Sequence, residues 1–133
     1  MKLNNNFKHD LEVGQLAEKN LADMFSNSTI EVKMDFMSYK TGNIYVEYES
    51  YQKPSGIATS EADFWCIYIM TEKGKRLQKN PSLKLEKEDV ETIILLSLEN
   101  LKHLCKTKYF RKDVKGGDFD ACRGLLIKAK DLV

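Results

Sequence analysis

The segment Asp63–Met70 (DFWCIYIM) is a nearly continuous apolar and aromatic run, and it constrains the fold more than any other part of the chain. A run of this length and character is typical of a strand that is buried on both faces. We therefore expect this segment to be the central strand of a sheet.

Two earlier segments alternate with a period of two residues. Thr29–Asp35 alternates apolar with charged residues, and Ile44–Glu49 does the same, which puts Glu47 and Glu49 on one face. Such alternation is typical of half-buried strands. The turn-forming residues Lys40–Asn43 lie between them, so we expect the two strands to pair with each other.

Helical spacing appears before and after these strands. Apolar residues recur at intervals of three and four from residue 10 to about residue 25, with Asp10 as the expected N-cap. Thr92–Leu96 could be another strand, Ser97 is placed to cap a short helix that ends near Lys106, and the residues 124–127 could add a last strand.

The order of these elements predicts an α/β (α+β) protein. A helix is followed by a three-stranded antiparallel meander, and then by a strand and a helix. The length of 133 residues fits one domain that spans residues 1–133.

Several classes of protein are disfavoured by the sequence. No apolar run approaches the roughly 20 residues of a membrane span, and the first residues lack the apolar core of a secretory signal, so we expect a cytoplasmic protein with no membrane contact. The cysteines Cys66, Cys105 and Cys122 are odd in number and far apart. This arrangement favours free thiols over a zinc site or a disulfide framework.

Three carboxylates are candidates for chemistry. If the two alternating strands pair, Asp35, Glu47 and Glu49 come close together. Their mutual repulsion would be neutralised by Mg²⁺ or Mn²⁺, which prefer oxygen ligands and keep water positions open. The alternative is a solvated acidic strand face that pairs with Lys33 and Lys40.

A fourth carboxylate, Glu18, lies on the same helical stripe as Leu11, Leu21 and Phe25, which are expected to face the sheet. An unpaired charge in a buried position costs several kcal/mol. Glu18 therefore lies either at a solvated edge of the stripe or beside a cation.

The order of these residues resembles the PD-(D/E)XK nuclease superfamily, whose members have the restriction-endonuclease-like fold. In particular, Glu18 is followed by Asp35 and, twelve residues later, by Glu47-Tyr48-Glu49. Four segments are similar to small phage- and prophage-encoded members of the superfamily. These segments are Glu31–Asp35, Thr41–Glu49, Ser55–Ile57 and Ala62–Trp65.

The resemblance implies a restriction-endonuclease-like core and a metal-dependent endonuclease that hydrolyses DNA. It makes Asp35 and Glu47 the principal ligands of Mg²⁺ or Mn²⁺, with the carbonyl of Tyr48 as a further oxygen, and it makes Glu18 a ligand of the metal or of its water. Members usually carry a lysine two residues after the second carboxylate. This chain has Glu49 there, which would serve as a metal ligand or a general base.

Smaller signals surround these carboxylates. Gly56 beside Ser55 would let the backbone approach another group closely, or the pair is a plain turn. Lys33 and Lys40 would form surface ion pairs or stabilise developing negative charge. Trp65 is expected in the core.

The charge is unevenly distributed along the chain. Residues 1–72 carry six lysines and eleven acidic residues, a net charge of −5, while residues 73–133 have a net charge of +6. The basic residues of Lys73–Lys79 and Lys102–Lys115, with Tyr109 and Phe110 among them, form a candidate surface for the DNA backbone. A solvated face of mixed charge is the alternative.

Two functions follow from these observations. The first is a Mg²⁺-dependent endodeoxyribonuclease in phage or mobile-element DNA metabolism. The second is a catalytically decayed module of the same fold that binds nucleic acid or a protein partner without cleavage. The sequence allows a homodimer, which is common among enzymes that cut two strands, but no residue pattern requires one.

Overall fold

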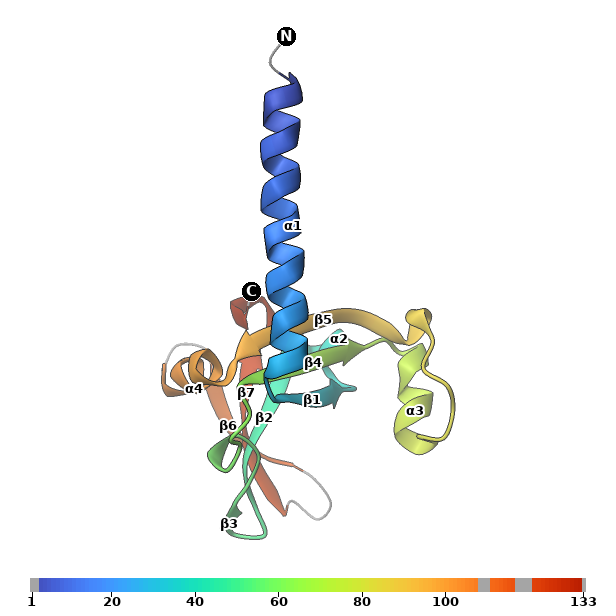
Figure 1. The fold of residues 1–133 in the computed structure, drawn as a ribbon. Helices are drawn as coiled ribbons and strands as arrows, with labels where there is room; N and C mark the ends of the chain where they lie inside the picture. Colours follow the sequence, from blue (N-terminus) through green and yellow to red (C-terminus); the bar gives the residue numbers. More distant parts are fainter. Residues whose placement is uncertain (1–2, 108–110, 117–120, 133) are drawn as a thin grey trace.

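The computed structural model describes residues 3–107, 111–116 and 121–132. The chain has a mixed α/β fold with two sheets, which cross one another in Figure 1. The first sheet has the strand order β1 (Ile30–Asp35), β4 (Phe64–Met70), β5 (Val90–Ser97). The second has the order β3 (Lys53–Pro54), β2 (Asn43–Ser50), β7 (Cys122–Lys128), β6 (Arg111–Gly116).

The helical segments connect these strands. The α-helices are α1 (Leu3–Asn27), α2 (Ser38–Thr41), α3 (Arg76–Lys79) and α4 (Leu98–Lys106). The 3₁₀ turns are η1 (Gly56–Ala58), η2 (Lys73–Lys75), η3 (Lys87–Asp89) and η5 (Ala129–Leu132).

The apolar strand β4 lies at the centre of the first sheet, as its sequence predicts. It pairs in parallel with β1, where Ile30 is opposite Phe64, and antiparallel with β5, where Phe64 is opposite Ser97. The strand β2 belongs to the other sheet and pairs with β3 and β7. The predicted antiparallel meander is therefore wrong. After β1 the chain enters the second sheet as β2, and it returns to the first sheet as β4, which pairs with β1 in parallel.

The core lies where the two sheets face each other. The second sheet contributes Ile44, Val46 and Ile127, and the first contributes Trp65, Ile67, Ile69 and Ile94. The helix α4 closes one side with Leu98, Leu101 and Cys105. Its N-terminus confirms the predicted cap, since the Ser97 hydroxyl accepts a hydrogen bond from the Asn100 amide at 3.1 Å.

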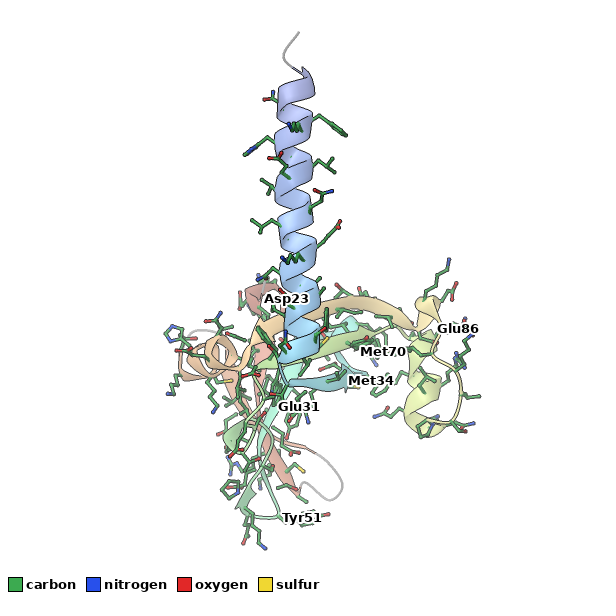
Figure 2. All side chains as sticks on the ribbon, in the orientation of Figure 1. Asp23, Glu31, Met34, Tyr51, Met70 and Glu86 are labelled. Carbon is green, nitrogen blue, oxygen red and sulfur yellow. The ribbon has the colours of Figure 1, made fainter. Side chains whose placement is uncertain are left out.

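The first helix is longer than the sequence predicts and is exposed to solvent over most of its described length. It begins at Leu3, so Asp10 lies inside the helix and is not its N-cap. The reason is that no glycine or proline interrupts the chain between these residues. Residues 6–23 are all exposed, and Figures 1 and 2 show α1 standing away from the sheets with side chains projecting on all sides.

The three cysteines are free thiols, as expected, with Cys66 and Cys105 buried and Cys122 half-buried. None of the helices in the described part of the chain combines the length and apolar character needed to cross a membrane.

A buried ion pair holds the segment between β4 and β5. The carboxylate of Asp89 is fully buried and accepts hydrogen bonds from Arg76 Nε at 3.1 Å and Arg76 Nη2 at 2.8 Å. The amide of Glu86 donates to the same carboxylate at 2.7 Å. The Arg76 guanidinium, and then the Glu86 amide, lower the pKa of Asp89 below its ordinary value.

We expect Asp89→Asn to destabilise the protein in a pH-dependent way. Because the folded pKa of Asp89 is depressed, its contribution to stability is present above the ordinary value of about 3.9 and is lost as the pH falls through the folded pKa. Urea unfolding at pH 7 should show a lower midpoint for Asp89→Asn than for the wild type, and this difference should shrink below about pH 4. The exposed neighbour provides a control, Glu88→Gln, and an equal loss in this control would contradict the assignment.

Candidate functional site

A cavity of about 220 Å³ lies at the junction of β1, β2 and β4. It combines two acidic residues and one basic residue with apolar walls. Its lining residues are Lys33, Met34, Asp35, Ile44, Tyr45, Val46, Glu47, Gly56, Trp65 and Ile67.

The strand β1 turns its charged face toward the core. Glu31, Lys33 and Asp35 alternate along the strand, and their partners in register on β4 are buried core residues. Val32 and Met34 point the other way and are 55% and 41% exposed. This orientation is the reverse of the usual half-buried strand, and it brings polar groups to the cavity.

Asp35 is held at the cavity wall by three backbone amides. Its Oδ1 accepts hydrogen bonds from the amides of Met37 at 2.9 Å and Ser38 at 2.7 Å, at the start of α2. Its Oδ2 accepts a longer bond from the amide of Tyr45 on β2, at 3.4 Å. One carboxylate thus connects β1, α2 and β2 across the two sheets.

Glu47 is positioned by the loop that follows β3. The hydroxyl of Ser55 donates to Glu47 Oε2 at 2.7 Å. Gly56 has a positive φ of 55°, and a Cβ on it would overlap the carbonyl oxygen of Glu47. The expected close backbone approach at Ser55 and Gly56 is therefore confirmed, and the group approached is Glu47.

Lys33 belongs to a small polar network at the rim of the cavity. Its Nζ lies 3.1 Å from Glu31 Oε2 and 5.3 Å from the centroid of the Trp65 ring. The Ser60 hydroxyl donates to Glu31 Oε1 at 3.3 Å and accepts from Trp65 Nε1 at 3.0 Å. The expected core position of Trp65 is confirmed, since only 2% of it is exposed, and its ring also supports the lysine through a cation–π contact.

Tyr45 is a site residue that the sequence pattern did not identify. Its ring occupies the space left by Gly124, where a Cβ would overlap it. Its hydroxyl is buried and has no hydrogen-bond partner among the described residues. Burial, and then the nearby Cys122 and Glu47, raise the pKa of Tyr45, so the phenol is neutral at ordinary pH.

A β-bulge separates Glu47 from Glu49. Glu47 is opposite Gly124 on β7, while Glu49 is opposite Arg123, which leaves Tyr48 as the extra residue. Gly124 and Arg123 are consecutive residues of β7 and point to opposite faces, so their partners Glu47 and Glu49 also lie on opposite faces of the sheet. The expectation that they share one face is therefore wrong.

The side chains around the bulge form a second polar group. Glu49 lines a separate pocket with Lys115 and Arg123. The Tyr48 hydroxyl donates to Asp113 Oδ2 at 2.8 Å, a bond that raises the pKa of Tyr48. The Tyr48 carbonyl, expected to be a metal ligand, accepts a hydrogen bond from the Ser55 amide at 3.0 Å.

The structure does not bring Glu18 to this cavity. Glu18 is exposed on α1 and is absent from the cavity wall. Within the described ranges, no group of three or more His, Cys, Asp and Glu side chains is placed to hold a metal ion. Of the four predicted carboxylates, only Asp35 and Glu47 share the cavity.

The predicted basic surface is only partly described. Lys73, Lys102 and Lys106 are exposed, whereas Arg76 is bound to the buried Asp89. Tyr109 and Phe110 lie outside the described residues.

No protein-family profile, curated protein or solved structure matches the chain. Two fixed carboxylates and one ammonium group around a small cavity form a donor set suited to a hard cation and an anionic substrate.

The contact between Gly56 and Glu47 can be tested by two matched glycine substitutions. Gly42 also has a positive φ, of 74°, but nothing lies within 4 Å of the position of its Cβ. We expect Gly42→Ala to lower the free energy of unfolding by about 1–2 kcal/mol, the cost of a left-handed backbone. Gly56→Ala should cost clearly more in urea unfolding, because the Glu47 carbonyl must also move, and equal losses would contradict this contact.

Proposed function

We propose that the chain is a divalent-metal-dependent endonuclease with a restriction-endonuclease-like core, which hydrolyses phosphodiester bonds of DNA in phage or mobile-element DNA metabolism. The observation that carries this proposal is the cavity shared by Asp35, Glu47 and Lys33. The net charge of +6 in residues 73–133 is consistent with a polyanionic substrate.

The donor set at the cavity fits Mg²⁺ or Mn²⁺. Mg²⁺ in proteins is commonly held by one or two carboxylates together with waters and substrate phosphates, so a third protein carboxylate is not required. Asp35 and Glu47 would hold the ion. Ser55 occupies only one oxygen of Glu47, and the other has no hydrogen bond within the described part of the chain. When bound, the ion would polarise a phosphate oxygen and lower the pKa of a coordinated water.

The protein's own groups have separate tasks in this proposal. The amides of Met37 and Ser38 fix the Asp35 carboxylate, and the Ser55 hydroxyl orients Glu47. Lys33, supported by Trp65, supplies a positive charge for the phosphate and for the negative charge that develops on it.

Lys33 compensates for the lysine that Glu49 replaces. Members of the superfamily that the sequence resembles usually carry a lysine two residues after the second carboxylate. Here the bulge turns Glu49 to the opposite face. The positive side chain at the cavity is instead Lys33, which lies on β1 of the other sheet. In the proposed mechanism Glu49 and Glu18 therefore have no catalytic role within one chain.

Conservative carboxamide variants test the proposed site. Asp35→Asn keeps an oxygen for the α2 amides, and Glu47→Gln keeps one for Ser55, while each removes a negative charge. We expect each to lower the rate of Mg²⁺- or Mn²⁺-dependent cleavage of plasmid or branched DNA at least about 100-fold. The wild type should gain melting temperature with Mn²⁺, and both variants should lose this gain.

Glu49→Gln is the matched control, since its side chain lies on the other face of the same strand. It should cleave at nearly the wild-type rate. Unchanged cleavage in both site variants would overturn the proposal. A wild-type protein that binds DNA in a salt-dependent manner, yet neither cleaves it nor responds to Mn²⁺, would indicate the non-catalytic module instead.

The lysine assignment makes a separate prediction. Lys33→Ala should lower the rate of cleavage by about 10- to 100-fold while leaving the Mn²⁺-dependent thermal shift in place, because it removes transition-state charge stabilisation and no metal ligand. Lys40→Ala, which changes an exposed residue of α2, should have little effect. Equal activities of the two variants would assign Lys33 only to its ion pair with Glu31.

A further inference from the structure

The helix α1 carries an apolar stripe that nothing in the described chain covers. Phe7, Leu11, Leu21 and Phe25 follow one side of the helix at helical spacing, with Gly14 and Glu18 on the same side between Leu11 and Leu21, and Phe7 and Phe25 are 68% and 56% exposed. A solitary helix in water is only marginally stable, because most helical stability in proteins comes from packing of such a face. The stripe therefore requires a partner surface.

The first sheet also has an apolar face that is exposed along its two edge strands, β1 and β5, while Cys66 on the central strand is buried. On the side of the sheet away from the core, Val32 is in register with Cys66 and Leu95, and Met34 is in register with Tyr68 and Ile93. We call these residues the outer face. Val32 and Ile93 are more than half exposed, at 55% and 52%. An apolar sheet face of three strands is normally buried under a helix.

Hydrogen bonds hold the junction between α1 and β1 against the start of β4. The Ser28 amide continues the helix by donating to the Met24 carbonyl at 3.0 Å. Directly after it, the Thr29 amide and hydroxyl both donate to Asp63 Oδ2, and the Thr29 carbonyl accepts from the amides of Asp63 and Phe64. Figure 1 shows α1 leaving the sheet at this junction.

We propose that two copies of the chain form an exchanged homodimer, in which α1 of each copy packs against the outer face of the other. One exposed surface is an apolar helix stripe and the other is an apolar sheet face, and a helix packing on a sheet is a common way to bury both. Each chain carries both surfaces. A two-fold axis makes the contact twice, so the buried area is doubled. The 25 residues of α1 span about 37 Å, which is longer than any strand of the sheet that they would cover.

This dimer is independent of the proposed nuclease function. The outer face is on the opposite side of β1 from Lys33 and Asp35, so the exchanged helix leaves the cavity open. Association can therefore be measured without DNA or metal.

The test measures the mass of the full-length chain in solution by sedimentation velocity and light scattering. The wild type should have twice the chain mass of 15.4 kDa. A double variant of the stripe, Leu11→Glu with Leu21→Glu, and a variant of the outer face, Ile93→Glu, should each have the mass of one chain. Leu16→Glu is the matched control, because Leu16 lies about 140° around the helix from both Leu11 and Leu21, and this variant should remain dimeric.

Mixing the two monomeric variants distinguishes exchange from other modes of association. The Ile93→Glu chain keeps an intact α1, and the double variant keeps an intact outer face, so a mixture should recover heterodimers through one of the two contacts. Circular dichroism of each variant identifies loss of folding. A monomeric wild type, whether α1 is free or folded onto its own sheet, would overturn the proposal. A dimeric Ile93→Glu variant would instead indicate pairing of α1 with α1, and a mixture without heterodimers would also contradict the exchange.

Discussion

The apolar character of β4 on both of its faces determines the layout of the molecule. β4 lies at the centre of the first sheet, and β1 and β5 form its two edges. Its inner residues Trp65, Ile67 and Ile69 then build the core against the second sheet. The polar groups of β1 lie beside them at the cavity because β1 is in register with β4.

Two local irregularities then sort the acidic residues. The bulge at Tyr48 places Glu47 and Glu49 on different faces of β2. The positive φ and missing side chain of Gly56 let the loop after β3 pack against the backbone carbonyl of Glu47. Both are features of the backbone, and each acts on a carboxylate. The site is thus shaped by where the chain departs from regular geometry as much as by the strands themselves.

The sequence predicted what is local and missed what is long-range. The strands, the Ser97 cap and the close approach at Gly56 leave periodic or compositional signals within a few residues. Pairing of β1 with β4 depends on contacts between segments more than 30 residues apart, which no local pattern encodes. Asp35 and Glu47 were expected to meet through paired strands, yet they reach one cavity from different sheets. The bulge has no distinctive residue, and the prediction for Glu49 failed for that reason.

The inward charges of β1 have a consequence for solubility. β1 is an edge strand, and its free side offers backbone donors and acceptors to any extended segment that approaches. An added strand would further enclose the ammonium group of Lys33 and the carboxylate of Glu31, whose side chains are now 47% and 34% exposed. Charged residues that point inward from an edge are a common protection against this kind of growth. Lys33, which lines the cavity, and its ion-pair partner Glu31 thus also protect the edge of the sheet against aggregation.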